Sequence, residues 1–273
     1  MALSLLRVPP QRGAAWVRDG FRLFGRRPLA FSGLFLVFLF VVMLTQFLPA
    51  VGGLLQMMML PLLSLGFMIG ARSALADGPV QPGQFFEPLA EEPRRRRALI
   101  VLCVAYGVSA ALLLWLCDVI SDGALGRLQA LLASGDTPRE EVDALMAEPG
   151  VFLATVVGLS GATLLSVPFW HAPALVHWGG QSAGQALFSS TLAVWRCKGA
   201  FVVYALVWAG VISLFGAVTA IVLGIAGAPQ LAGLLALPAG LMFSTVFYVS
   251  LIFTFNDSFG RGDDPTQFAE LDA

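Results

Sequence analysis

The side chains with the greatest capacity for chemistry lie in one short stretch, FWHAPALVHW, at residues 169–178. This stretch contains both histidines of the chain, His171 and His177, with Pro173 between them. Imidazole groups can serve as acid–base catalysts, metal ligands or contacts to phosphate. A separation of six residues on a helix places the two rings on different faces. The spacing therefore differs from the i, i+4 pair that a helical zinc site uses.

The surroundings of the two histidines favour an anchor at a membrane surface over a metal site. No cysteine or carboxylate lies nearby in the sequence to complete a set of zinc ligands. Trp170 and Trp178 flank the histidines, and tryptophan is enriched where a membrane meets water. We expect the rings to hydrogen-bond to lipid headgroups or to the backbone. A pH-responsive or lipid-phosphate contact is the functional alternative.

One carboxylate could join this motif. Asp257 lies in the sequence FNDSF at the end of the last apolar segment, where it could cap a helix or approach the histidines. If Asp257, His171 and His177 met at one cavity, they could act on lipid as a membrane-embedded enzyme. No nucleophile elbow, phosphate-binding loop or paired carboxylates are visible. We therefore expect no enzymatic activity, no metal and no cofactor.

The composition indicates that much of the protein surface is surrounded by lipid. Of 273 residues, 58% are hydrophobic and only 12% are charged, whereas soluble domains carry about 25% charged residues. A soluble fold with so few charges would expose large apolar patches that aggregate. The net charge of −1 gives no reason to expect nucleic acid as a partner. The sequence predicts a membrane protein whose principal partners are lipids; any protein partner is unknown.

Six apolar segments are long enough to cross a bilayer, which takes about 20 residues of helix. None of them contains a charged residue or a histidine. They are apolar on every face, whereas the strands of a membrane barrel alternate. The predicted fold is an all-α bundle of six transmembrane helices, forming one domain over 1–273, with spans at 29–49, 51–71, 98–117, 150–170, 200–225 and 231–255.

The arginines and lysines predict the orientation of the bundle. Fourteen basic residues fall in the segments on one side of the spans and two on the other. The basic side faces the cytoplasm in most membrane proteins. Both termini are therefore expected in the cytoplasm. Residues 118–149 form the one sizeable loop on the opposite side, with seven acids and a capping pattern that predicts a short helix over about 138–147.

Two segments on the cytoplasmic side have the pattern of helices lying at the membrane surface. In 11–27 an apolar face containing Ala14, Val17, Phe21 and Phe24, with Trp16 and Leu23 at its edge, lies opposite Arg18, Arg22 and Arg26. The segment 181–196 repeats the pattern more weakly, with Ala183, Leu187, Val194 and Trp195. We expect anionic lipid headgroups to contact Arg18, Arg22, Arg26, Arg94, Arg95, Arg96 and Arg97.

A threefold plan is a further hypothesis about the bundle. Each unit would consist of an interfacial segment, basic residues and then a transmembrane hairpin. The short segment QFFEPL at 84–89 would be the interfacial part of the second unit. Superposing the three hairpins would test the idea, and unrelated helix orientations would end it.

At FWHAPALVHW the chain resembles a family of uncharacterised polytopic inner-membrane proteins of β-proteobacteria. Members share a tryptophan and a basic-proline step before the first span, here Trp16 and Arg27-Pro28, and a later Trp-Arg pair, here Trp195-Arg196. The resemblance covers nearly the whole chain and implies a multi-pass protein of the bacterial inner membrane. More loosely, the plan is similar to the membrane domain attached to some glycerophosphodiester phosphodiesterases. Neither resemblance brings an activity, because the first family has no assigned reaction and the catalytic domain of the second is absent here.

Three functions remain open from the sequence. The first is a non-enzymatic scaffold or regulator that contacts lipids and partners, which agrees best with the confinement of the charged residues to the segments outside the spans. A transporter or channel would need an uncharged or amphiphilic substrate, because no span carries an ionisable group; Gln46, Gln56 and Met57–Met59 could line its path. The lipid enzyme described above is the third.

Overall fold

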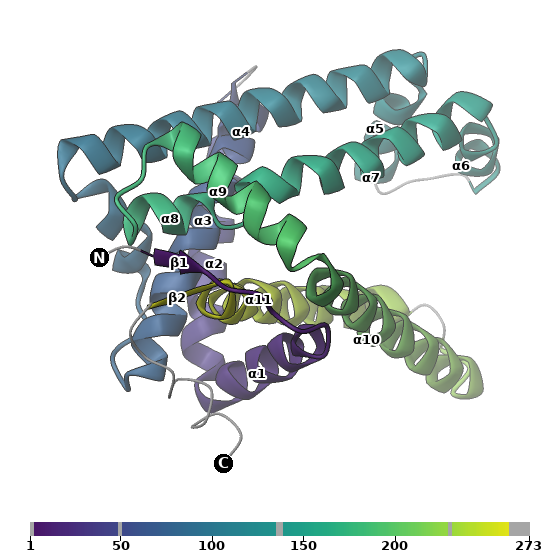
Figure 1. The fold of residues 1–273 in the computed structure, drawn as a ribbon. Helices are drawn as coiled ribbons and strands as arrows, with labels where there is room; N and C mark the ends of the chain where they lie inside the picture. Colours follow the sequence, from purple (N-terminus) through teal and green to yellow (C-terminus); the bar gives the residue numbers. More distant parts are fainter. Residues whose placement is uncertain (1–2, 49–50, 135–138, 229–230, 262–273) are drawn as a thin grey trace.

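The computed structural model of the chain describes residues 3–48, 51–134, 139–228 and 231–261 (Figure 1). Helices dominate these residues, and a pair of short strands joins the two ends of the chain. In chain order the elements are β1 (Leu3–Leu5), α1 (Arg12–Arg26), α2 (Pro28–Thr45), α3 (Gly52–Leu75), the 3₁₀ helices η1 (Pro82–Phe85) and η2 (Glu87–Leu89), α4 (Pro93–Ile120), α5 (Ala124–Ser134), α6 (Arg139–Met146), α7 (Pro149–Phe169), α8 (Ala172–His177), α9 (Ala183–Arg196), α10 (Lys198–Ile225), α11 (Ala232–Ser258) and β2 (Phe259–Arg261).

The predicted all-α membrane fold is confirmed. Six helical segments are long and apolar enough to cross a membrane. Five of them are the single helices α2, α3, α4, α10 and α11, and the sixth consists of α7 together with α8. The helix α4 begins before its predicted span, because Pro93 suits the first helical position and the four arginines that follow favour a helix. The helix α2 ends at Thr45, whereas its span was predicted to reach 49, and residues 49–50 lie outside the described part.

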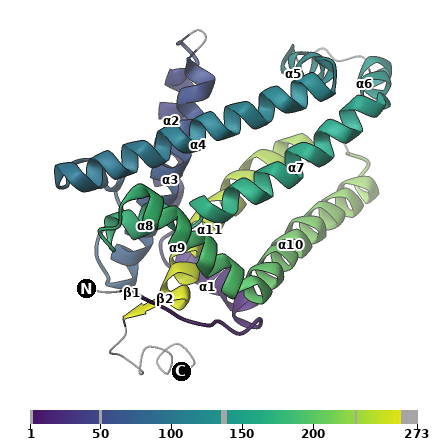
Figure 2. The same ribbon diagram turned by 45° about the horizontal axis from the view of Figure 1, so that its top comes forward.

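Consecutive spans form three hairpins, α2–α3, α4–α7 and α10–α11. Figure 2 shows the α4–α7 and α10–α11 hairpins extending toward the right of the view, whereas α2–α3 stands upright. Shorter helices precede each hairpin: α1 the first, η1 and η2 the second, and α9 the third. This order of elements follows the threefold plan. The superposition of the three units remains a prediction.

The loop between α4 and α7 contains the expected short helix. The helix α6 spans Arg139–Met146, against a prediction of about 138–147. The threonine and proline of the predicted cap, at 137 and 138, lie outside the described residues. The helix α5 precedes α6 and packs against both α6 and α7.

The core of the protein lies where the hairpins meet, around the second half of α11. That half is buried from Val249 to Phe255 and packs against α1, α2 and α3. The far ends of the hairpins expose their leucines and isoleucines, for example Leu237 at 77% and Ile225 at 85%. Apolar side chains exposed on membrane-crossing helices are in their proper solvent, because lipid tails are as apolar as leucine.

The helix α1 is packed into this core and does not only lie on a surface. Its buried face contains Gly13, Trp16, Val17, Gly20 and Leu23, whereas Ala14, which the hydrophobic pattern placed on the apolar face, is exposed. That prediction of the face was wrong by about one residue position. The pattern missed the two glycines, which have no side chain to count.

The two glycines explain how close α1 comes to its neighbours. A Cβ atom at Gly13 would overlap the carbonyl oxygen of Ala200 in α10. A Cβ atom at Gly20 would lie 2.7 Å from the Cβ of Ser250 in α11. Small residues permit this kind of close backbone approach between helices. The helix α1 therefore crosses both members of the last hairpin.

The strands β1 and β2 were not predicted. They pair antiparallel, with Leu3 opposite Arg261 and Leu5 opposite Phe259. The beginning of the chain therefore lies beside the end of α11 (Figure 1). This pairing agrees with an even number of spans, which returns the chain to the side on which it began.

Candidate functional site

The histidine motif lies inside the protein. The helix α7 ends at Phe169, and α8 follows after a short break, with every residue from Ala172 to His177 buried. Pro173 stands in the first turn of α8, where its missing N–H is not needed. The helix α8 packs against α3, α4 and α9. The expected contact of the two histidine rings with lipid headgroups is therefore not what the structure shows.

A serine of α9 hydrogen-bonds to the backbone at the break between α7 and α8. In an unbroken helix the backbone N–H of His171 would donate to the carbonyl of Val167. Instead it donates to Ser190 Oγ at 3.0 Å, and that hydroxyl donates to the Val167 carbonyl, also at 3.0 Å. Ser190 is fully buried. One side chain thus satisfies both backbone groups that the break would leave unpaired.

The ring of His171 is held by a threonine of α11. His171 Nε2 lies 3.1 Å from Thr254 Oγ1, which also accepts a 3.2 Å hydrogen bond from the indole N–H of Trp170. The ring edges meet Phe255 and Phe259. The Nδ1 atom of His171 is buried and has no hydrogen-bond partner among the described residues. Such a ring is positioned as a packing element, out of reach of solvent.

His177 belongs to a different cluster. Its Nδ1 atom lies 3.0 Å from Glu91 Oε1, in the segment just before α4. Arg95 donates to the backbone carbonyl of His177 at 3.1 Å and approaches Glu91 at 3.5 Å. The guanidinium of Arg72 stacks over the ring of Trp178 at 5.0 Å. Sequence reasoning missed Glu91 because it is remote from the histidines along the chain.

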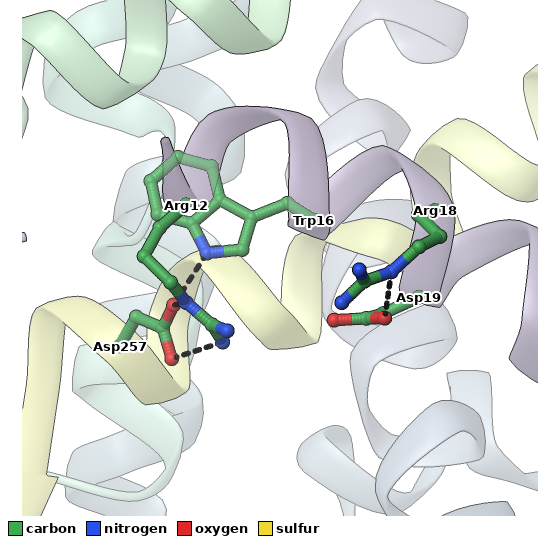
Figure 3. Close-up of polar contacts among 5 residues, drawn as sticks. All are labelled: Arg12, Trp16, Arg18, Asp19 and Asp257. Atoms are coloured by element: carbon green, nitrogen blue, oxygen red, sulfur yellow. Dashed lines mark hydrogen bonds and ion pairs between the residues drawn. The ribbon is translucent and has the colours of Figure 1, made fainter. Parts of the chain in front are cut away.

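Asp257 is bound to the N-terminal helix. Its carboxylate accepts hydrogen bonds from Arg12 Nε at 2.8 Å, from the Arg12 terminal nitrogen at 3.2 Å and from Trp16 Nε1 at 2.7 Å (Figure 3). The carboxylate side chain is 7% exposed, and that of Arg12 is 20% exposed. The two donors come from α1 and the acceptor from the last turn of α11. Asp257 therefore fixes α1 against the core.

Three polar residues of α11 form a stripe along one face. Ser250, Thr254 and Asp257 are spaced at i, i+4 and i+7, which places them on one side of a helix. The Tyr204 hydroxyl of α10 lies 2.6 Å from Ser250 Oγ, Trp170 donates to Thr254, and Trp16 donates to Asp257. Each polar residue of the stripe thus forms a hydrogen bond with an aromatic side chain, and the three aromatic residues come from different segments. The spacing was visible in the sequence, but its partners were not.

The three candidate acid–base residues do not meet at a cavity. One cavity, an open groove of about 580 Å³, lies between α5, α6 and α7, and a second of about 140 Å³ lies between α3, α4, α7 and α11. Neither is lined by His171, His177 or Asp257. Within residues 3–48, 51–134, 139–228 and 231–261 no group of three potential ligands is placed to hold a metal ion. Joint acid–base work by these three residues has no geometric support.

The arginines predicted to contact lipid are mostly open to the surroundings. Arg18 and Arg22 of α1 have side chains 50% and 64% exposed, and both are near the buried Asp19, at 3.2 and 3.7 Å. Arg95 is half-buried by its contacts to Glu91 and His177. The remaining members, Arg26, Arg94, Arg96 and Arg97, are exposed. Six membrane crossings in alternating directions would put α1, the start of α4 and the β1–β2 pair on the same face of the membrane.

Comparison with known proteins gives one informative similarity. The chain is 30% identical over 259 residues to a probable inner membrane protein of Burkholderia thailandensis, and the match covers 94% of each protein. No family model matches the chain, and no solved structure matches it. Since the similarity extends over nearly the full length and includes all six spans, the chain belongs to the family of this probable inner membrane protein and is itself a multi-pass protein of the inner membrane.

Proposed function

We propose that the protein is a non-enzymatic scaffold or regulator that binds anionic lipid headgroups on the cytoplasmic side of the inner membrane. The observation that carries this proposal is a set of arginines on α1 and at the start of α4, all exposed except the half-buried Arg95. Six alternating membrane crossings would put them on one face of the membrane. An arginine near an anionic membrane surface contributes about 1 kcal/mol to binding. The seven arginines in question are Arg18, Arg22, Arg26, Arg94, Arg95, Arg96 and Arg97.

The side chains most suited to catalysis support a structural role. Asp257 is engaged by Arg12 and Trp16, and His171 by Thr254. His177 Nδ1 lies 3.0 Å from Glu91 Oε1. A general acid or base must reach a reacting atom in a cavity, and these groups are committed to holding helices together. We infer that the protein contributes a fixed, basic platform and no chemical step.

The proposal includes an orientation with both termini in the cytoplasm. This orientation is supported by the distribution of basic residues: fourteen lie in the segments on one side of the predicted spans and two on the other side. The β1–β2 pair places both ends of the described chain on one side, so a single measurement of either end locates both.

Lipid binding provides the test. The purified protein is titrated with vesicles of phosphatidylcholine containing or lacking phosphatidylglycerol. We expect binding to the anionic lipid to fall at least tenfold when Arg18, Arg22 and Arg26 are all replaced by glutamine, since three such contacts contribute about 3 kcal/mol. Arg127→Gln is the matched control, because Arg127 is similarly exposed but lies on the opposite side. Equal losses in the two variants, or none in the triple variant, would contradict the proposal.

An alternative function is transport of an uncharged or amphiphilic molecule. Two of the residues expected to line such a path are used in packing: Gln56 Nε2 lies 3.4 Å from the Val42 carbonyl, and Met58 fills the space at Gly107. The observation that favours transport is the 140 Å³ cavity among four spans. Flux of a fluorescent amphiphile in reconstituted vesicles, absent from protein-free vesicles, would support the alternative over the scaffold.

A further inference from the structure

The cavity of about 140 Å³ has walls from four different spans. Leu60, Pro61 and Ser64 of α3 face Tyr106 of α4, and the other walls are Ser166, Phe169 and Trp170 of the α7 end and Phe247, Tyr248 and Leu251 of α11. Tyr106 stands about 20 Å along α4 from Pro93, at 1.5 Å of rise per residue. Because half the hydrocarbon layer is roughly 15 Å thick, the wall at Tyr106 lies within the lipid tails and below the headgroups.

Two phenol groups give this cavity its polarity. Neither the Tyr106 nor the Tyr248 hydroxyl forms a hydrogen bond with another described residue. Both side chains line the cavity, Tyr106 from α4 and Tyr248 from α11. Water is scarce among lipid tails, and a polar group left unpaired there is costly. An occupant with hydrogen-bond acceptors would remove that cost.

The remaining walls indicate the shape of the occupant. An apolar cavity of roughly 150 Å³ holds a molecule the size of benzene. Phe169, Trp170 and Phe247 line one part of this space, which is open on one side, and aromatic rings pack well edge to face. Pro61 and Pro168 interrupt the backbone hydrogen bonding of α3 and α7 beside it. The geometry favours a flat ring over an unbranched chain.

We propose that this cavity binds the ring of a lipid-soluble quinone, whose carbonyl oxygens accept hydrogen bonds from Tyr106 and Tyr248. Such a ring is apolar enough to reach the middle of a bilayer, and it carries acceptors that an acyl chain lacks. The ester carbonyls of phospholipids lie at the interface, above the depth of Tyr106. The site is separate from the arginines of the proposed lipid platform, and it would stand if that platform were disproved.

A pair of matched probes tests the proposal. A decyl-substituted benzoquinone and decylbenzene share a ring and a chain, but only the first has carbonyl groups. Binding to the purified full chain in nanodiscs is measured by titration and counted by native mass spectrometry. We expect one benzoquinone per chain, bound at least several-fold more tightly than decylbenzene. Decylbenzene binding as tightly as the quinone would overturn the assignment to a carbonyl ligand.

Variants of the three tyrosines locate the hydrogen bonds. The double variant Tyr106→Phe and Tyr248→Phe should weaken benzoquinone binding about tenfold, the effect of two ordinary hydrogen bonds, and leave decylbenzene binding unchanged. Tyr204→Phe is the control, because that hydroxyl is already bonded to Ser250. Unchanged quinone binding in a double variant that elutes as a single folded species would overturn the proposal.

A further variant tests the site without changing the tyrosines, in case the tyrosine variants do not fold. Ser166 lies at the edge of the cavity and is half-buried, and its hydroxyl donates only to the Thr163 carbonyl of its own helix. Ser166→Phe should fill the cavity without removing a contact between helices. Both probes should then bind at least tenfold more weakly. Full quinone binding by this variant would place the ligand elsewhere and overturn the site.

Discussion

The indole N–H of Trp16 donates a 2.7 Å hydrogen bond to the carboxylate of Asp257, 241 positions away in the chain. The same carboxylate accepts two N–H groups of Arg12. Trp16 and Asp257 are both buried, so the hydrogen bond between them is shielded from water and is strengthened by the low local dielectric constant. They make the first helix of the chain a part of its last hairpin.

Replacing Asp257 by alanine should therefore destabilise the whole bundle. The variant leaves the Trp16 indole without its acceptor and Arg12 without its carboxylate, so we expect the free energy of unfolding to fall by about 2–4 kcal/mol. Asp257→Asn keeps an acceptor oxygen and should lose less than half as much. Unfolding in mixed detergent and dodecyl sulfate measures both. An equal loss in the two variants would show that charge alone matters and not the hydrogen bond to Trp16.

The close approach of α1 and α11 depends on Gly20. Gly20→Val should push the helices apart, because the new Cβ would lie 2.7 Å from that of Ser250. Overpacking of this kind costs about 1–3 kcal/mol. Gly25→Ala is the matched control: a Cβ atom at Gly25 would meet no atom within 4 Å, and alanine favours a helix. Protease cleavage before residue 28 should accelerate in the first variant only.

The hydroxyl of Ser190 bridges the break between α7 and α8. Ser190→Ala leaves the N–H of His171 and the carbonyl of Val167 without this bridge in a buried place, so we expect a loss of about 1–3 kcal/mol in unfolding free energy. Ser189→Ala, one position away, removes a hydroxyl with no hydrogen bond to a described residue. Hydrogen exchange should also quicken at the amide of His171. Equal stability of the two variants would mean that the bridge contributes little.

The proposed cytoplasmic position of the termini can be tested by labelling. Single cysteines are introduced at Gly25 in α1 and at Gln129 in α5, both exposed, after removal of the three native cysteines. In intact cells a membrane-impermeant thiol reagent that enters the periplasm should label the cysteine at 129 and spare the one at 25. The reverse pattern would contradict the orientation assigned from the basic residues.

The sequence predicted the spans well and the site poorly, for physical reasons. A span is a local property, because about 20 consecutive apolar residues suffice to place a helix in lipid. The partners of Asp257, His171 and His177 are properties of the packed bundle, contributed by segments far away in the chain. The glycines of α1 carry no hydrophobic signal, so the buried face of that helix was predicted one position away from where it lies.

One signal for the core is present in the sequence of the last span. Ser250, Thr254 and Asp257 occupy a single face of a largely apolar helix, and polar groups within a membrane need partners. Three aromatic residues with N–H or O–H groups supply them, namely Trp16, Trp170 and Tyr204. A search for such stripes in other membrane chains would reveal where helices converge.

The pairing of β1 with β2 has a consequence for biosynthesis. A ribosome delivers Leu3–Leu5 long before Phe259–Arg261, so the earlier strand has no partner until the later one has been made. The helix α1 must likewise wait for α10 and α11 before Trp16 and Gly20 are covered. A nascent chain that lacks α10 and α11 would present these residues to the cell's quality-control proteases, whereas a chain that contains both helices conceals them.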